Sequence, residues 1–418
     1  MTGPMTSTAA LAARIGADLG RVRPQPGTQA TAAVVLGFVS EPGDGVLGRV
    51  AEILGAEAAA AALLAGTSAG ELADRVGASG EGAPSARELA AGLGRWMPRL
   101  DLDAIARSVA QAARVGARLV LPGDQAWPVG LDDLGAHAPH GLWVRGRPAA
   151  LAARASIALV GARAATGYGE HVAVDAAAGL ADRGFTVVSG GAYGIDGAAH
   201  RSTLASGGTT VAYLAGGIDR FYPAGHEGLL GRIAETGAVV SELPCGAAPT
   251  RWRFLQRNRM IAAVATATVV IEAGLRSGSL NTAGHAATLG RALGAVPGPV
   301  TSPASAGCHR LLREYAAVCV TDAAQMAELV GVPDGGDAGD GDVRTSASAD
   351  PTDRALAILT SDERRVLDAL AMRRVRSIEE LVRSTGMASG AVRGALGALD
   401  ATGLATRAAG GWVRRRTG

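Results

Sequence analysis

Two glycine-rich turns, each directly after a short apolar run, hold the residues of this chain best suited to bind an anion. In the first turn the candidate ligands are Gly161, Arg163, Thr166, Tyr168 and Gly169. The second turn opens with Gly190 and Gly191. Glycine lets the backbone approach a ligand closely, and the free N–H groups at a helix start point toward a negative charge. The pattern predicts a phosphate site built from backbone N–H groups, with the Arg163 guanidinium as a charged fork.

Neither turn matches a common nucleotide-binding motif. Because neither fits G-x-x-x-x-G-K-[ST] or G-x-G-x-x-G, we do not expect a P-loop or a standard dinucleotide fold. Within the second turn, Asp196 and His200 stand four residues apart and would share one helix face. They could form an acid–base pair, or Asp196 could cap the helix while His200 packs under the loop. We favour the second interpretation.

A third motif, residues 215–223, combines glycines with Arg220, Phe221 and Tyr222. Aromatic side chains beside an arginine bind single-stranded nucleic acid by stacking and charge. The alternative is that Phe221 and Tyr222 belong to the core.

Residues 251–261 form the most arginine-rich motif, with four arginines and two aromatic residues. Within it Arg257, Asn258 and Arg259 would suit phosphates or a carboxylate. The alternative is a solvated run of charge.

A carboxylate, Glu272, ends the next apolar run and precedes a small polar loop with Ser277, Gly278 and Ser279. Glu272 could act as a general base, or it could pair with Arg257 or Arg259 and fix the loop. We expect the pairing.

The elements that must position these motifs alternate between apolar strands and helices from residue 155 to about residue 330. Helices are expected, for example, over 170–183 and 283–293. Such alternation predicts an α/β fold with a doubly wound, mostly parallel sheet. Strands are expected at 118–121, 141–145, 157–160, 186–188, 210–214, 238–241, 268–271, 295–296 and 317–320. In such sheets ligands bind at the carboxyl ends of the strands, where both glycine turns lie.

The sequence outside this block predicts four further segments. Residues 1–30 are expected to be a flexible leader and residues 31–117 a small helical domain, followed by the α/β block at 118–332. Residues 333–353 are rich in Asp, Gly and Ser and are expected to be an acidic flexible linker. Residues 354–418 read as three helices and a hairpin, which is typical of a winged helix. Residues 352–418 hold twelve Arg against seven Asp or Glu, a modest excess that suits DNA or an acidic protein face.

Composition excludes several classes of site. The 418-residue chain has no lysine, so a Schiff-base lysine and a P-loop lysine are excluded. Its three cysteines are widely spaced, which argues against a disulfide framework and fits a reducing cytosol. Its histidines and cysteines lack the spacing of metal ligands, which argues against a metal site. No apolar run reaches the roughly 18 residues of a membrane span, and the start lacks a signal peptide pattern. The net charge of +2 disfavours a uniformly basic coat but allows a local patch.

Taken in order, the six motifs resemble the DNA-processing protein A (DprA/Smf) family. The similarity lies in Val160-Gly-Ala-Arg…Tyr168-Gly, Ser189-Gly-Gly-Ala-Tyr-Gly-Ile-Asp-Gly-Ala-Ala-His, Gly216-Gly-Ile-Asp…Tyr222-Pro, Ser241-Glu-Leu-Pro, Arg257-Asn-Arg-Met-Ile and Glu272-Ala…Ser277-Gly-Ser. The resemblance implies an extended Rossmann centre, a sterile-alpha-motif-like helical front and a winged-helix tail.

The resemblance also implies a function. It suggests a cytosolic protein that binds single-stranded DNA during natural transformation, protects it and loads RecA, and that forms a homodimer through the Rossmann domain. It implies no catalytic turnover and no cofactor. Residues Gly161, Arg163, Tyr168, Gly190, Gly191, Arg257, Asn258 and Arg259 would line the DNA phosphate pocket.

Two other functions remain open from the sequence alone. The first is an enzyme that cleaves or binds a phosphorylated nucleoside, like a nucleotide N-glycosidase, with Glu272 and Asp196 as its carboxylates. The loop after Glu272 lacks the P-G-G-x-G-T run of such enzymes, which counts against this function. The second is a winged-helix regulator with a ligand-sensing Rossmann domain.

Overall fold

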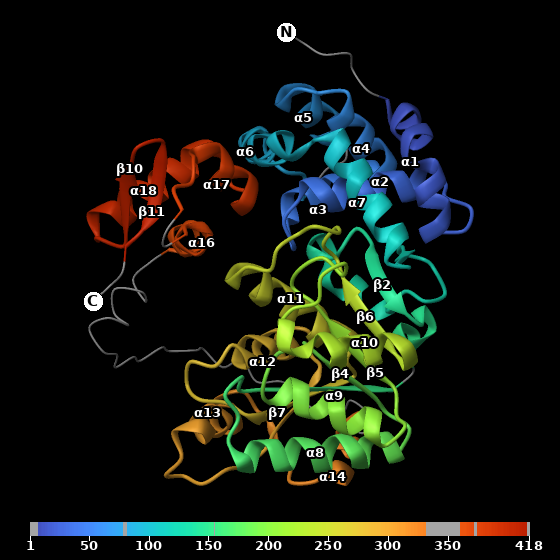
Figure 1. Ribbon diagram of the computed structural model, residues 1–418, viewed down its shortest axis with the longest axis vertical. Helices are drawn as coiled ribbons and strands as arrows, with labels where there is room; N and C mark the ends of the chain where they lie inside the picture. Colours follow the sequence, from blue (N-terminus) through green and yellow to red (C-terminus); the bar gives the residue numbers. More distant parts are fainter. Residues whose placement is uncertain (1–6, 78–81, 154, 332–359, 372–373, 416–418) are drawn as a thin grey trace. The chain divides into compact units, whose positions relative to one another are not determined.

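The computed structural model describes residues 7–77, 82–153, 155–331, 360–371 and 374–415. Its residues divide into two compact units, of which the first holds the chain to residue 93 and residues 100–330. The second holds residues 94–99 and the chain from residue 331 (Figure 1). The acidic linker predicted at 333–353 lies outside the described residues.

One large sheet organises the first unit. Within the described residues it has nine strands in the order β1-β2-β6-β5-β4-β3-β7-β8-β9. The strands are β1 (Arg118–Val120), β2 (Leu142–Gly146), β3 (Ser156–Gly161), β4 (Thr186–Ser189), β5 (Thr210–Tyr213), β6 (Ala238–Ser241), β7 (Ala267–Glu272), β8 (Ala292–Ala295) and β9 (Val318–Cys319). Strands β3 to β9 pair in parallel, whereas β2 runs antiparallel to β6 and β1 antiparallel to β2. The predicted α/β, mostly parallel and doubly wound sheet is confirmed.

Alternating side chains along the strands bury both faces of this sheet. Along β3, Ile157 and Leu159 pack into one apolar cluster, whereas Ala158 and Val160 pack into another. Successive side chains of a strand point to opposite faces, so a nearly continuous apolar run needs helices on both sides.

Helices from the connections cover the two faces (Figure 1). Those on one face are α8 (Gly167–Asp182), α9 (Ile195–Ala205), α10 (Glu227–Thr236) and α14 (Ala323–Gly331). Those on the other face are α11 (Arg251–Val264), α12 (Ser279–Thr288) and α13 (Ala306–Glu314). The predicted helix 283–293 is wrong at its end, because α12 stops at Thr288 and Ala292 already begins β8.

The chain reverses direction across the sheet beside β3. It builds β3, β4, β5 and β6 toward one edge and then returns to place β7 on the other side of β3. The loops that follow β3, β4 and β7 therefore meet at the carboxyl edge near this switch point, where doubly wound sheets bind their ligands.

The front of the chain is helical from residue 8. Its helices are α1 (Thr8–Val22), α2 (Thr28–Val39), α3 (Gly45–Leu54), α4 (Ala56–Leu64), α5 (Ala69–Gly77), α6 (Ala86–Trp96) and α7 (Leu102–Arg114). The prediction of a flexible leader is wrong for residues 8–22. Leu11, Ile15, Leu19 and Val22 recur at spacings of four and three and are buried, and α1 packs on α7.

A buried ion pair ties the helical front to the sheet domain. Arg253 of α11 donates from Nε to Oε2 of Glu41 at 3.0 Å and from Nη2 to Oε1 at 2.6 Å. Both side chains are less than one tenth exposed. This bidentate contact helps explain why the front and the sheet form one compact unit, although we expected two separate domains.

Among the residues described from 360 on, the second unit has three α-helices and a hairpin. The elements are α16 (Ser361–Ala369), α17 (Ile378–Thr385), α18 (Ser389–Ala401), β10 (Ala405–Ala408) and β11 (Gly411–Arg414). A capping box opens α17, since the Ser377 hydroxyl accepts from the Glu380 N–H while the Glu380 carboxylate accepts from the Ser377 N–H. The winged-helix fold is confirmed. In both units together, no described helix is long and apolar enough to cross a membrane.

Removal of the Glu41 charge is expected to destabilise the first unit. Glu41→Gln leaves the buried Arg253 guanidinium without its counter-ion, which should lower the free energy of unfolding by about 3 kcal/mol. Urea unfolding followed by tryptophan fluorescence measures the change. Asp133→Asn is the control, because Asp133 is half exposed beside Arg291, and exposed pairs contribute only about 0–1 kcal/mol. Equal effects of the two substitutions would refute the structural role of the Glu41–Arg253 pair.

Candidate nucleic-acid interface

Glu272 holds the first glycine turn in place. Thr166 caps helix α8, and its N–H and hydroxyl donate to Oε2 and Oε1 of Glu272 at 2.8 Å and 2.6 Å. Glu272 is 2% exposed. Both of its carboxylate oxygens therefore bind the loop. The expected pairing of Glu272 with Arg257 or Arg259 is wrong, because the nearer polar hydrogens belong to Thr166.

The second glycine turn is held at one residue, Gly190, through both its carbonyl and its N–H. Nη1 of Arg257 donates to the Gly190 carbonyl at 2.6 Å and also to the Tyr213 carbonyl. From the other side, Oδ2 of Asp196 accepts from the Gly190 N–H at 3.1 Å and from the Ala192 N–H at 3.3 Å. A Cβ atom on Gly190 would lie 2.0 Å from Nη1 of Arg257, so only glycine fits there.

Burial shifts the pKa values of both charged groups that hold Gly190. It lowers the pKa of Arg257 to about 10, with the nearby Asp196 acting in the opposite direction. It raises the pKa of Asp196, which Arg257 and the two N–H donors partly oppose. Each group thus stabilises the charged form of the other in a place with little water.

His200 does not pair with Asp196. Thr210 donates its hydroxyl to the Val187 carbonyl at 2.7 Å, so the Thr210 oxygen accepts from Nδ1–H of His200 at 2.7 Å. The other ring nitrogen of His200 is buried without a hydrogen-bond partner. The structure therefore contradicts an acid–base pair and agrees with the favoured interpretation, in which Asp196 binds the turn and His200 packs below it.

Arg257, Asn258 and Arg259 are all buried, so this part of the run is not solvated charge. Arg259 forms a bidentate ion pair with Glu242 at 2.7 Å and 2.6 Å. The Asn258 amide donates to the Gly278 carbonyl at 3.2 Å and so binds the loop after β7. The expectation that these three side chains line the phosphate pocket is corrected: in this structure they position the loops around it.

Exposed Arg163 and Tyr222 lie beside the half-buried ring of Phe254 at this edge, and we call the three residues the Arg163–Phe254–Tyr222 surface. The Cζ atom of Arg163 lies 4.4 Å from the ring centroid of Phe254. The Phe254 ring lies 5.7 Å from that of Tyr222, which is 48% exposed. Tyr222 is therefore not a core residue. The structure adds Phe254 to the site, and its spacing of three residues from Arg257 on a helix is the sequence signal for it.

The remaining predicted residues lie at the same carboxyl edge in different roles. Tyr168 is exposed, and its hydroxyl donates to the Pro297 carbonyl after β8. Ser277 and Ser279 bond each other through their hydroxyls at 2.7 Å beside the exposed Gly278. Arg220 is exposed. Gly161 and Gly169 pack closely, because a Cβ atom on either would lie within 2.8 Å of an atom of Glu272. Gly191 has a φ of +69°, a backbone conformation that favours glycine.

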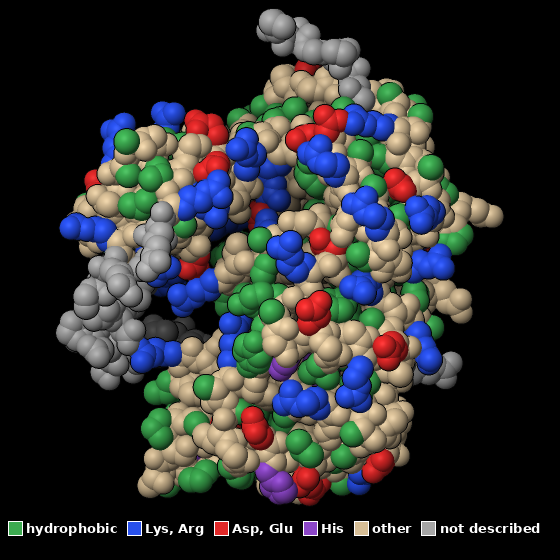
Figure 2. Space-filling view, viewed as in Figure 1, with side chains coloured by type: hydrophobic (Ala, Val, Ile, Leu, Met, Phe, Trp, Pro, Cys, Tyr) green, Lys and Arg blue, Asp and Glu red, His purple; other side chains and the backbone are tan. Residues whose placement is uncertain are grey.

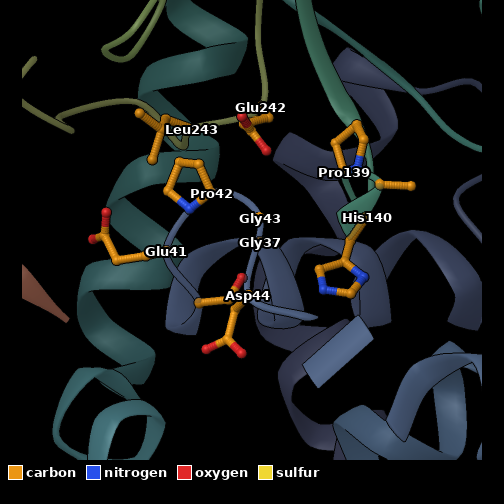
Figure 3. Close-up of a pocket in the computed structure, with 11 residues that line it drawn as sticks. Gly37, Glu41, Pro42, Gly43, Asp44, Pro139, His140, Glu242 and Leu243 are labelled. Carbon is orange, nitrogen blue, oxygen red and sulfur yellow. The ribbon is translucent and has the colours of Figure 1, made fainter. Parts of the chain in front are cut away.

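A small pocket lies between the helical front and the carboxyl end of β6 (Figure 3). Its lining includes Glu41, Asp44, His140 and Glu242. Glu41 and Glu242 are already paired with buried arginines. Burial lowers the pKa of His140 to about 4, so the ring is neutral near pH 7. Three carboxylates around a neutral ring do not suit a phosphate.

The structure combines a doubly wound α/β sheet, whose carboxyl edge carries two glycine turns beside an arginine and aromatic surface, with a separate winged helix. The family model "DNA recombination-mediator protein A" matches residues 118–331, and "DprA winged helix domain" matches residues 350–411. The chain belongs to the DNA-processing protein A (DprA/Smf) family of DNA recombination mediators.

Individual relatives agree with this assignment. A Mycobacterium tuberculosis protein with the provisional name DNA processing protein DprA is 50% identical over 332 residues, which are 77% of this chain and 82% of that protein. Protein Smf of Escherichia coli is 40% identical over 191 residues, which are 46% of this chain and 50% of that protein. The X-ray structure of DprA from Streptococcus pneumoniae superposes with a TM-score of 0.57 at 27% identity, covering 72% of this chain and 97% of that one.

Acid is expected to destabilise the protein through His200. Burial lowers the pKa of His200 to about 3, whereas the unfolded chain keeps a value near 6.5. Between these values the unfolded state binds the extra proton, so the free energy of unfolding should fall with decreasing pH, by about 2 kcal/mol from pH 7 to 5 for this group.

Urea unfolding of the wild type and of His200→Gln at both pH values tests this expectation. The variant should lose about 2 kcal/mol less than the wild type over the same pH step. Parallel losses in the two proteins would show that His200 is not the titrating group.

Proposed function

We propose that this protein binds single-stranded DNA along the carboxyl edge of its sheet. The observation that carries the proposal is the exposed Arg163–Phe254–Tyr222 surface, which lies beside two loops whose backbone is held rigid from below. Bases can stack on the Tyr222 and Phe254 rings, while phosphates meet the Arg163 guanidinium. Such contacts read no base edges, so binding should depend weakly on sequence and strongly on salt.

The buried arginines act on this site indirectly. Arg257 and Asp196 hold Gly190, and Arg259 is neutralised by Glu242. A strand bound at the edge therefore meets loops that need little ordering, which lowers the entropic cost of binding.

Beyond DNA binding, we propose that the protein protects incoming DNA and loads RecA during natural transformation or recombination. We further propose that it works in the cytoplasm as a homodimer joined through the Rossmann domain. The family assignment supports these roles.

We propose a binding role without catalytic turnover. Both oxygens of Glu272 are engaged by Thr166, and Asp196 and His200 are buried apart from each other. These contacts give structural roles to the residues that a nucleotide N-glycosidase mechanism would need as acid or base.

Truncation of the exposed surface is expected to weaken binding of single-stranded DNA. Phe254→Ala removes a stacking ring, worth about 1–3 kcal/mol per base, so the Kd should rise about 5- to 100-fold. Arg163→Ala removes a cation and should also reduce the dependence of log K on log salt, by about 0.7 for one phosphate. Fluorescence anisotropy with a labelled oligothymidine measures both quantities.

Arg183→Ala is the matched control for this measurement. Arg183 is an exposed arginine between α8 and β4, at the amino edge of the sheet opposite the proposed site. The Arg183→Ala variant should bind single-stranded DNA as tightly as the wild type does. If Arg163→Ala and Phe254→Ala also bind like the wild type, the proposed DNA site is wrong.

RecA loading is tested with the full chain and single-stranded DNA coated with single-strand-binding protein. The wild type should shorten the lag before RecA filaments form, and Phe254→Ala should restore the lag, because loading requires the strand to be held. A wild-type protein that leaves the lag unchanged would exclude RecA loading without affecting the DNA-binding proposal. Sedimentation of the free protein gives its mass and tests the dimer.

A further inference from the structure

Charge is unevenly divided within the second unit. In the described part of the chain, its extended segments 374–376, 405–408 and 411–415 carry five arginines and no Asp or Glu. Its helices α16, α17 and α18 carry four arginines and six carboxylates. The modest excess of Arg seen in the sequence is therefore concentrated on the strand side. In Figure 2, basic side chains are visible where Figure 1 draws β10 and β11.

We call the strand side of the second unit the wing surface, and strand pairing places part of its arginines in one row. Its arginines are Arg374, Arg376, Arg407, Arg414 and Arg415. Trp412 pairs with Arg407 across the hairpin and bridges to Arg376 on its other side, with both N–H···O distances to Arg376 at 2.9 Å. Cross-strand neighbours point to the same face of a sheet, so Arg376 and Arg407 flank Trp412 in one row.

The arginines of the wing surface are accessible. Arg374, Arg407 and Arg415 are exposed, and Arg376 and Arg414 are partly exposed. Arg374 contacts Glu380 at 3.0 Å, but it keeps most of its side chain in solvent and such an exposed pair is weak. Five arginines on segments that hold no carboxylate give this side a net positive charge, which would attract a polyanion.

Helix α18, by contrast, is poorly equipped to read bases. In winged and helix-turn-helix proteins the recognition helix presents Arg, Asn, Gln or Glu to base edges in the major groove. The exposed residues of α18 are Ser389, Gly390, Ala391, Arg393, Gly394, Gly397, Asp400 and Ala401. Most of these side chains are too short to reach a base edge, and the Asp400 carboxylate would repel a phosphate.

We infer that the winged helix binds the phosphodiester backbone of DNA through the wing surface, and that α18 does not read sequence. The wing surface belongs to the second unit, whereas the Arg163–Phe254–Tyr222 surface belongs to the first. The inference about the wing surface therefore does not rest on the function proposed for the first unit. Guanidinium groups on a two-stranded hairpin can follow a phosphate backbone, and phosphate contacts give affinity without sequence information. Single strands and duplexes share this backbone, so each is a separate arm of the test.

The test uses the full chain with two matched double variants. Arg407→Gln/Arg415→Gln removes two charges from the wing surface, and Arg383→Gln/Arg393→Gln removes two exposed charges from α17 and α18. Glutamine keeps a polar side chain of similar length, and circular dichroism checks that each variant is folded. Anisotropy with a labelled duplex and a labelled single strand is measured over a range of salt.

The wing variant should bind the duplex about tenfold more weakly at low salt, and its slope of log K against log salt should be smaller by about 2. The control variant should match the wild type. The single-strand arm shows whether the same arginines also hold a single strand, in which case the wing variant should lose affinity there as well.

Two results would overturn the inference. In the first, the wing variant binds duplex and single strand as tightly as the wild type but loses affinity for a polyglutamate probe. That result would assign the surface to an acidic protein partner. The other is a larger loss of duplex affinity in the control variant than in the wing variant, which would assign the contact to the helices. Loss of single-strand binding in Phe254→Ala tests the first unit separately, so failure of one proposal leaves the other intact.

Discussion

The carboxyl edge of this sheet depends on how one residue, Gly190, is held through both of its backbone polar groups. Arg257 binds its carbonyl and Asp196 binds its N–H, and both side chains are buried. A buried arginine and a buried carboxylate are each costly alone, but together, with backbone partners, they satisfy one another and fix the turn between them. The loops after β3 and β7 are fixed in the same way, by Glu272 and Asn258.

This arrangement divides the polar residues into a buried layer and an exposed layer. The buried layer shapes the backbone, and the exposed layer, with Arg163, Phe254 and Tyr222, is left to meet a ligand. A strand of DNA is long, flexible and uniform in charge, so a rigid edge with stacking rings suits it better than a closed pocket. The second unit divides its charge too, with arginines on its strands and carboxylates on its helices.

Sequence reasoning succeeded where the signal was local and periodic. Apolar runs separated by glycine turns predicted the sheet. It failed for the leader, because an Ala-rich composition hid the spacing of Leu11, Ile15 and Leu19 in α1. It also failed for the arginine run, because sequence alone does not show that Glu41 and Glu242 come to lie beside Arg253 and Arg259.

By itself, the sequence determined the class of fold, the family and the edge of the sheet at which a ligand is expected, since these follow from short-range patterns and ordered motifs. Only the tertiary structure decided which charged residues face that ligand. The run of residues 251–259 shows why: on one helix, Phe254 reaches the surface while Arg257 and Arg259 turn inward to partners that are distant in sequence. Burial and pairing are properties of the packed chain, and they convert arginines that look like ligand contacts into the supports of the loops.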